Sequence, residues 1–182
     1  MKATKYVVIL LIMLTACKSA DTGVTEAEAQ QTRDLIEGAN YEITMDWALP
    51  LATNAMTQIS NANLLPMDSR SGRINLMGTS SYIRSQGDIL EVYLPYFGTR
   101  QLTITPGDTN GAIQFEGVPE RYEAVYNEKK QLTAISFRMK DKNEQFDVNI
   151  KVFGNKNANV YVNSTHRNSI RYTGSLAALD EM

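Results

Sequence analysis

Residues 145–153 read QFDVNIKVF, and this stretch decides the fold class. Every second side chain from Phe146 to Val152 is apolar, and the side chains between them are polar or charged. A period of two is typical of a strand with one face buried and the other in water. Such strands belong to antiparallel sheets, because parallel strands are usually buried on both faces and are apolar throughout.

Similar short segments lie on both sides of this stretch, separated by turn residues. Working outward along the chain, they are residues 158–163, 170–173, 132–139, 122–126, 113–116, 102–105, 89–94, 82–85, 74–77 and 41–45. We therefore predict a mainly β fold, an antiparallel β-sandwich or small barrel of about 8–10 short strands. Residues 51–73 fit either a short strand or a turn of helix followed by a loop.

One helix is expected before the strands. Thr25 and Glu28 have the spacing of a capping box, with Thr25 at the N-cap and Glu28 at the third helical position. The helix should run over about residues 26–37. It should end at Gly38, where a glycine can adopt the left-handed conformation common at helix C-termini.

The N-terminus has the features of a secretory signal peptide. Lys2 and Lys5 precede an apolar run over residues 6–14, which is too short to span a membrane as a helix. Leu14, Thr15, Ala16 and Cys17 then resemble a bacterial lipobox, in which the cysteine is lipidated and the chain is cut just before it. The alternative is an ordinary signal peptide with an incidental cysteine.

These features predict four segments. They are a signal peptide (1–16), a lipidated cysteine with its tether (17–24), a single β domain with an N-terminal helix (25–176) and a loose acidic tail (177–182). Cys17 is the only cysteine in the chain, so the domain has no disulfide. We expect a lipoprotein of the cell envelope, anchored to the outer membrane on either its periplasmic or its surface face.

Charge gives little support for nucleic acid as a partner. The chain has 18 lysines and arginines against 20 aspartates and glutamates, and removal of the signal peptide would take away Lys2 and Lys5. The sequence contains no basic stripe of the kind that binds phosphate backbones.

Several motifs together resemble the DUF4251 family, small envelope proteins of Bacteroidetes that often carry lipoprotein signals. They are Asn40-Tyr41 leading to Trp47-Ala-Leu-Pro50, Ser80-Ser-Tyr-Ile83, Gly87-Asp88, Leu94-Pro-Tyr-Phe-Gly98, and residues 160–174. The resemblance covers about residues 25–176, and Leu94–Gly98 is its most specific piece. It implies an envelope β domain and no established activity, substrate or catalytic residue.

The candidates for chemistry are few. His166, the only histidine, lies in a polar segment near Ser164 and Ser169, without a nucleophile-elbow motif, and an exposed loop histidine is expected. Asp141, Asn143 and Glu144 offer oxygen atoms for calcium but lack the rest of an EF-hand loop, so a solvated turn is expected. Glu116, Glu120 and Glu123 are candidate acid–base carboxylates, and a charged loop is the simpler interpretation. We predict no metal site and no cofactor.

A set of aromatic residues could build either an apolar pocket or a cap on the core. Its members are Trp47, Tyr93, Pro95, Tyr96, Phe97 and Tyr172, with Tyr161 a further candidate wall residue. Pocket walls need such side chains, but β domains also fill their cores with them. Because Pro95 lacks an N–H, it should lie at a strand end or edge. The motif Leu94–Gly98 is therefore expected to plug one end of the core.

From the sequence we expect a lipid-anchored, non-enzymatic protein that acts as a binding or structural module. Its partners would be the membrane, through lipid on Cys17, and an envelope protein, glycan or lipid. The alternatives are an envelope hydrolase that uses carboxylates or His166, and an inhibitor that docks by a sheet edge.

Overall fold

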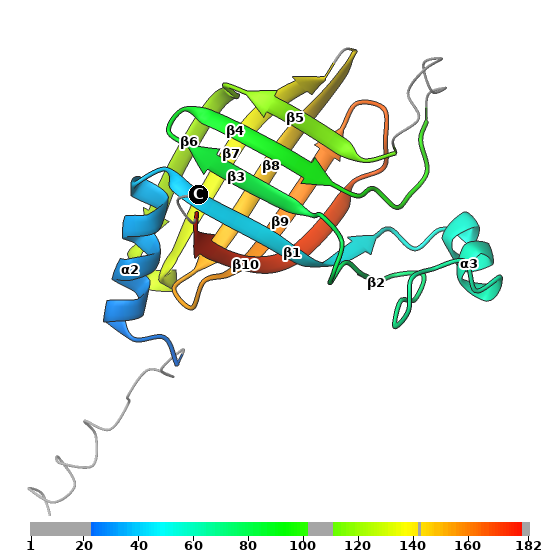
Figure 1. The fold of residues 1–182 in the computed structure, drawn as a ribbon, viewed down its shortest axis with the longest axis horizontal. Helices are drawn as coiled ribbons and strands as arrows, with labels where there is room; N and C mark the ends of the chain where they lie inside the picture. Colours follow the sequence, from blue (N-terminus) through cyan, green and yellow to red (C-terminus); the bar gives the residue numbers. More distant parts are fainter. Residues whose placement is uncertain (1–22, 102–110, 142, 180–182) are drawn as a thin grey trace, which may run out of the picture.

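The computed structural model describes residues 23–101, 111–141 and 143–179. These residues form an antiparallel sheet of ten strands and two α-helices (Figure 1), which confirms the mainly β prediction. The elements are α2 (Glu26–Glu37), β1 (Asn40–Pro50), α3 (Asn54–Asn61), β2 (Ile74–Asn75), β3 (Tyr82–Gln86), β4 (Ile89–Leu94), β5 (Ile113–Gly117), β6 (Glu120–Asn127), β7 (Leu132–Asp141), β8 (Glu144–Phe153), β9 (Asn157–Ser164) and β10 (Ile170–Ala178). The predicted signal peptide, most of the predicted tether, the predicted strand 102–105 and residues 180–182 lie outside the described residues.

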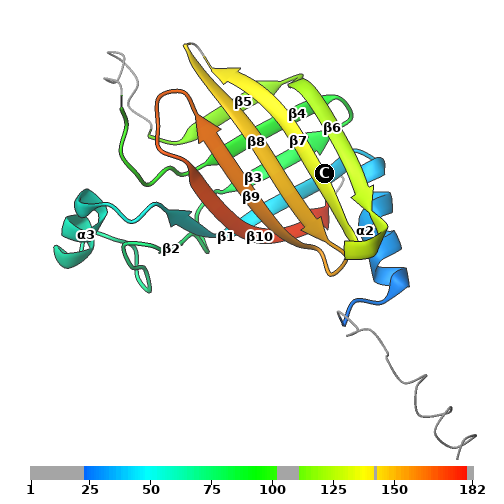
Figure 2. The same ribbon diagram turned by 180° about the vertical axis from the view of Figure 1, so that it is seen from behind.

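The sheet curls into a half-barrel. Its strand order is β5-β4-β3-β1-β10-β9-β8-β7-β6, with the short β2 added to β1. Strands β3, β4 and β5 lie over β7, β8 and β9, as the front and back views show (Figures 1 and 2). The core fills the space between these two layers. The edge strands β5 and β6 follow each other in the chain and are joined by a corner at Val118 and Pro119.

The alternation that predicted the strands is the alternation of burial. In β8 the apolar positions from Phe146 to Val152 are at most 1% exposed, and they face the core. The facing layer contributes Ile83, Leu90, Val92 and Leu94, which are also buried. Each layer thus has one face buried in the core and one face toward solvent, as the period of two in the sequence predicts.

Strand β1 is longer than its sequence suggests because a bulge interrupts it. Its register against β10 shifts between Met45 and Trp47, and the strand then continues to Pro50. The bulge moves the buried face from odd-numbered to even-numbered residues, so that Ala48 is buried. Opposite the bulge is Gly174, where a Cβ atom would collide with the backbone of Thr44 and Met45.

Strand β10 does not end at Gly174 as the sequence suggests. It continues to Ala178, which pairs with Tyr41 of β1. The alternating pattern is weak over these last residues, which are mostly small or polar. Pairing with β1 therefore orders them.

Helix α2 has the predicted bounds, Glu26–Glu37, and Gly38 is its C-cap residue. Thr25 accepts a hydrogen bond from the Glu28 N–H (3.2 Å), and the Glu28 carboxylate accepts one from the Thr25 N–H (2.8 Å), which completes the capping box. Only the predicted left-handed conformation of Gly38 was wrong: Gly38 is right-handed, and Ala39 takes the left-handed conformation (φ 48°). The helix packs one face on the sheet, where the Thr32 hydroxyl donates to the Gly154 carbonyl (2.8 Å).

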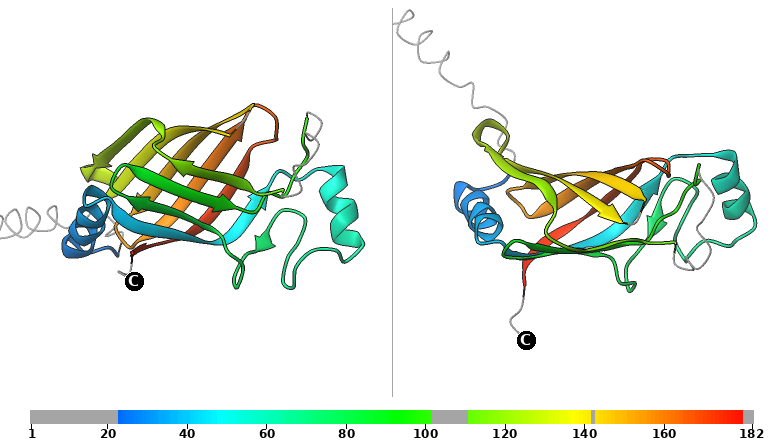
Figure 3. Two further views of the ribbon diagram at one scale, coloured as in Figure 1. Left: turned by 45° about the horizontal axis from the view of Figure 1, so that its top comes forward. Right: turned by 90° about the horizontal axis from the view of Figure 1, so that it is seen from above.

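The ambiguous segment 51–73 holds a second helix, α3. Thr53 caps it, and Met56 is its one buried residue. The segment extends from the end of the domain opposite α2 (Figure 3), and Leu64 and Met67 are largely exposed there. Because the segment has few apolar residues at regular spacing, its sequence fits either a strand or a helix.

Candidate functional site

The Leu94–Gly98 motif lies at the end of the half-barrel away from α2. Strand β4 ends at Leu94, which is buried. The next carbonyl, of Pro95, accepts a 2.9 Å hydrogen bond from the hydroxyl of Tyr172, a fully buried residue of β10. Burial raises the pKa of the Tyr172 phenol, so this hydroxyl stays protonated and remains a donor at neutral pH.

Tyr96 and Gly98 fold back on each other. The Tyr96 hydroxyl lies 3.0 Å from the Thr99 carbonyl oxygen and 3.1 Å from that of Asn168. A Cβ atom at Gly98 would lie 2.6 Å from the Tyr96 hydroxyl oxygen, closer than real Cβ atoms approach. Glycine at this position therefore lets the tyrosine ring turn over the core and reach the β9–β10 connection.

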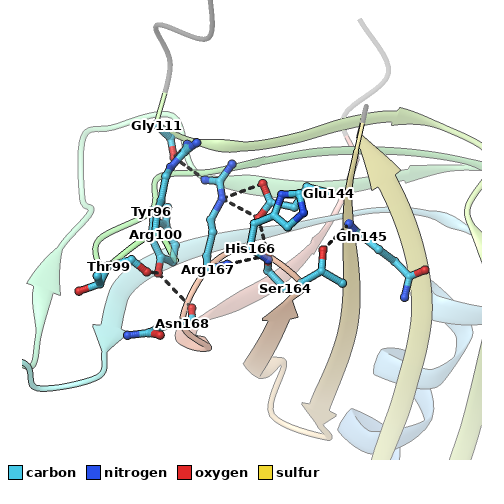
Figure 4. Close-up of polar contacts among 11 residues, drawn as sticks. Tyr96, Thr99, Arg100, Gly111, Glu144, Gln145, Ser164, His166, Arg167 and Asn168 are labelled. Atoms are coloured by element: carbon cyan, nitrogen blue, oxygen red, sulfur yellow. Dashed lines mark hydrogen bonds and ion pairs between the residues drawn. The ribbon is translucent and has the colours of Figure 1, made fainter. Parts of the chain in front are cut away.

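A buried ion pair completes this end of the domain (Figure 4). Nε of Arg167 lies 2.8 Å and 3.1 Å from the two carboxylate oxygens of Glu144, and an Arg167 terminal nitrogen donates to the Gly111 carbonyl at 2.7 Å. The guanidinium carbon lies 5.2 Å from the Tyr96 ring centroid and 5.6 Å from that of Phe146. The expectation of a solvated turn at 141–144 was therefore wrong for Glu144.

Ser164 and His166, the residues of the hydrolase alternative, belong to the same connection. The Ser164 hydroxyl donates to Glu144 and accepts from the main-chain N–H groups of His166 (2.9 Å) and Arg167 (3.1 Å). Among the described residues, no hydrogen bond joins the His166 ring to a hydroxyl. Ser164 thus caps a turn. The expectation of a non-enzymatic role stays a prediction.

The predicted aromatic set does not form one wall. Tyr172 bonds to the Pro95 carbonyl, Tyr96 lies beside Arg167, and Phe97 packs half-buried against the core. Tyr93 lies on the outer face of β4, stacked on Tyr82 with centroids 6.2 Å apart. Trp47 lies under the Arg73 guanidinium, 3.7 Å from the ring centroid. Tyr161 lies on β9, with the Lys151 amine 5.9 Å from its ring.

The other end of the half-barrel is open. A cleft of about 340 Å³ lies where β6 emerges from under the facing layer. We call it the α2 cleft. Its lining residues come from α2 (Arg33, Ile36, Glu37) and the following Ala39, from the β3–β4 hairpin (Gly87, Asp88, Leu90), from the β5–β6 corner (Val118, Pro119), and from β6 and β7 (Tyr122, Ala124, Tyr126, Thr133).

The α2 cleft exposes apolar surface on the inner face of the sheet, the face that is buried along β8. The β6 side chains on its floor point to the inner face of the sheet, yet Tyr122 is 42% exposed because the facing layer ends at the β3–β4 hairpin. Val118 at the corner is 69% exposed. Apolar walls with a few polar groups are typical of ligand sites, and the volume is at the lower end of their usual range of about 300–1,000 Å³.

Polar groups lie at the floor and the rim of the cleft. The Tyr122 hydroxyl is 3.2 Å from that of the buried Tyr41, and burial is the main cause that raises the pKa of Tyr41. At the rim, Arg33 is paired with Glu37 (2.7 Å), and the Arg33 guanidinium carbon lies 5.0 Å from the Tyr126 ring centroid. The hydrogen bond to Glu37 raises the pKa of Arg33, which carries its charge at neutral pH.

Two other hollows are lined mainly by polar side chains. One lies beside Lys130, Asn155 and Asn159, and the other beside Tyr82, Glu91 and Gln114. The described residues contain no group of three or more His, Cys, Asp or Glu side chains placed to hold a metal. No helix in this part of the chain is long and apolar enough to cross a membrane.

Comparison with known families identifies the chain. The model of DUF4251, a domain of unknown function, matches residues 24–176. The chain belongs to the DUF4251 family. The resemblance carried by the Leu94–Gly98 motif and its companion stretches is therefore confirmed, while the lipoprotein signal stays a prediction.

A solved DUF4251 structure has the same fold. The crystal structure of a DUF4251 family protein from Bacteroides eggerthii DSM 20697 matches with a TM-score of 0.54 and 12% identity, over 84% of this chain and 88% of the other. No curated protein matches the sequence. At this identity the likeness establishes the fold of this DUF4251 chain and nothing about its ligand.

Sequence reasoning missed the α2 cleft. The signal available was the pattern of β6, where Tyr122, Ala124 and Tyr126 alternate with Glu123 and Val125 and read as an ordinary half-buried strand. Nothing in the sequence says that the facing layer stops short of β6. Arg167 and Glu144 were also missed as partners, because they lie 23 residues apart and meet only when β8 and β9 pair.

Proposed function

We propose that this protein is a lipid-anchored, non-enzymatic binding module of the cell envelope, and that the α2 cleft is its binding site. One observation carries the proposal: the half-barrel has a packed end at Leu94–Gly98 and an open, apolar end at α2. If the domain had only a structural role, covering the exposed side chains of Tyr122 and Val118 would make it more stable.

The chemistry of the cleft favours an apolar group as its ligand. Val118 offers an exposed aliphatic wall, and the nearly buried Ile36 and Leu90 lie beneath it. The polar lining groups are the Tyr122 hydroxyl and the side chains of Arg33, Glu37 and Asp88. The ligand would be an apolar part of an envelope protein, glycan or lipid. Lipid on Cys17 and the tether that follows would hold the domain at the outer membrane, where such partners occur.

The packed end supports a structural role for Ser164, one residue of the hydrolase alternative. The Ser164 hydroxyl, the Glu144 carboxylate and the Arg167 guanidinium are bonded to one another, and Arg167 is 6% exposed. Arg167 also lines a hollow of about 390 Å³, but Ser164, Glu144 and His166 are not among the residues that line it. We therefore prefer the binding module to the envelope hydrolase.

A neutral fluorescent probe, N-phenyl-1-naphthylamine, tests the proposal on the intact protein. We expect saturable binding, and a loss of affinity of at least about tenfold in Ala124→Trp, which fills the cleft. Val125→Trp is the matched control, because the neighbouring side chain of β6 points away from the cleft. Absence of binding, or equal binding by wild type and Ala124→Trp, would contradict the proposal.

A further inference from the structure

Strand β6 has one edge without a strand partner. On one side it pairs with β7, from Ala124 opposite Ile135 to Asn127 opposite Leu132. On the other side, none of the described residues pairs with it. Figures 1 and 2 both show β6 as the outermost strand of its layer. Its outward N–H and C=O groups are therefore available to a further strand.

Only half of this edge is protected. Over the first half a register shift separates Glu120 from Glu123, and Arg121 takes a positive φ of 55°. Bulges and charges of this kind block strand pairing. From Ala124 to Asn127 the pairing with β7 is regular and the side chains are uncharged, and Val125 is 52% exposed. A further strand can therefore pair with residues Ala124–Asn127.

The open half of the edge lies beside the α2 cleft. Ala124 and Tyr126 line the cleft, whereas Val125 points to the outer face of the sheet. Side chains of an added strand would alternate in the same way. Every second side chain would lie over the cleft, beside Val118 and Tyr122, and those between would lie outside.

We propose that β6 accepts an extended segment of a partner protein as an additional strand, whose alternate apolar side chains enter the α2 cleft. This inference rests on the proposed function, since it names the occupant of the same cleft. Main-chain hydrogen bonds to Ala124–Asn127 bind the segment, and the cleft selects its side chains, as in other cases of strand addition.

The charge of Glu123 indicates which side chains the added strand carries on its outer face. Glu123 is exposed on the outer face of β6 and makes no ion pair with any described residue. A lysine or arginine at the end of the added strand beside Ala124 would lie next to Glu123 on the same outer face and pair with its charge. The segment therefore alternates apolar residues with polar residues that include a base.

Peptide binding measured by fluorescence polarisation tests the inference with the intact protein. The probe is a pool of labelled ten-residue peptides in which Val, Leu or Phe alternates with Lys or Thr. Each binding peptide is then made in two further forms, with backbone N-methyl groups on odd or on even residues. In a strand only alternate N–H groups face the neighbour. We expect one N-methylated form to bind at least about tenfold more weakly and the other to bind as before.

The variants connect the peptide to the cleft and separate this inference from the proposed function. Ala124→Trp should weaken peptide and N-phenyl-1-naphthylamine alike. If the dye binds but no peptide does, or if both N-methylated forms bind equally, strand addition is wrong and the cleft remains a site. If neither binds, both proposals fail. A concentration-dependent dimer in sedimentation velocity, abolished by Val125→Lys, would show that a second copy occupies the edge and would overturn the inference.

Discussion

Nε of Arg167 lies 2.8 Å from a carboxylate oxygen of Glu144, and the two side chains are only 4% and 12% exposed. Removal of one member of a buried pair leaves the other charge without compensation. We expect Glu144→Gln to lower the free energy of unfolding by about 3–5 kcal/mol, measured by urea denaturation.

An exposed pair supplies the control. Asp147 lies 2.8 Å from Arg138 in a pair whose side chains are 47% and 25% exposed. Because water screens such a pair, Asp147→Asn should cost about 0–1 kcal/mol. Equal losses in the two variants would show that the Arg167–Glu144 pair does not stabilise the packed end of the domain.

The close approach of β1 and β10 depends on Gly174. A Cβ atom there would collide with the carbonyl oxygen of Thr44, which is backbone and cannot rotate away. Gly174→Ala should destabilise by at least about 1–3 kcal/mol, seen as a lower denaturation midpoint. Gly72→Ala, with open space around its Cβ position, should stay within about 0.5 kcal/mol of wild type.

Alkaline pH should unfold the protein through its buried tyrosines. Burial raises the pKa of Tyr172 above its unfolded value of about 10, so the neutral phenol is favoured in the folded state. This contribution is complete below about pH 10. It is lost as the pH rises further, because the unfolded chain ionises first, at up to about 1.4 kcal/mol per pH unit.

Tyr172→Phe tests this pH dependence. The melting temperature at neutral pH should fall, since the Pro95 carbonyl loses a hydrogen bond worth about 1 kcal/mol. The decline above about pH 10 should be shallower than in wild type. Parallel curves for the two proteins would contradict the assignment.

Membrane attachment should depend on Cys17. Acyl chains contribute about 0.8 kcal/mol per buried CH₂, so their loss should release the domain from the membrane. We expect Cys17→Ser to move the protein from the membrane to the soluble fraction and to abolish labelling by radioactive palmitate. Palmitate labelling that persists in Cys17→Ser would refute the lipoprotein interpretation.

The sequence predicted those elements whose local residue pattern is typical of only one structure. The alternation in residues 145–153 predicted the strand, and Thr25 with Glu28 predicted the helix start. Both signals are local. The pairing of Gly174 with Met45, by contrast, depends on a bulge that only the assembled sheet contains.

The candidate site was less predictable because it arises from the relative extent of two layers. The aromatic residues that stood out in the sequence, Tyr96 and Tyr172, belong to the packed end. The α2 cleft is built from residues such as Ile36, Leu90 and Tyr122, which have the ordinary patterns of helix and strand. What makes them a site is that Tyr122 and Val118 stay exposed beside the buried Ile36 and Leu90, since no segment of the described chain covers this part of the inner face.

The most direct test of the account is a methyl NMR titration of the intact protein with N-phenyl-1-naphthylamine. The account predicts saturable shifts for the methyl groups of Ile36, Leu90 and Val118, which line the α2 cleft, and none for Leu94 and Ile170 at or near the packed end. Shifts at Leu94 and Ile170 with unchanged cleft methyl groups would show that the ligand enters at the other end and would contradict it.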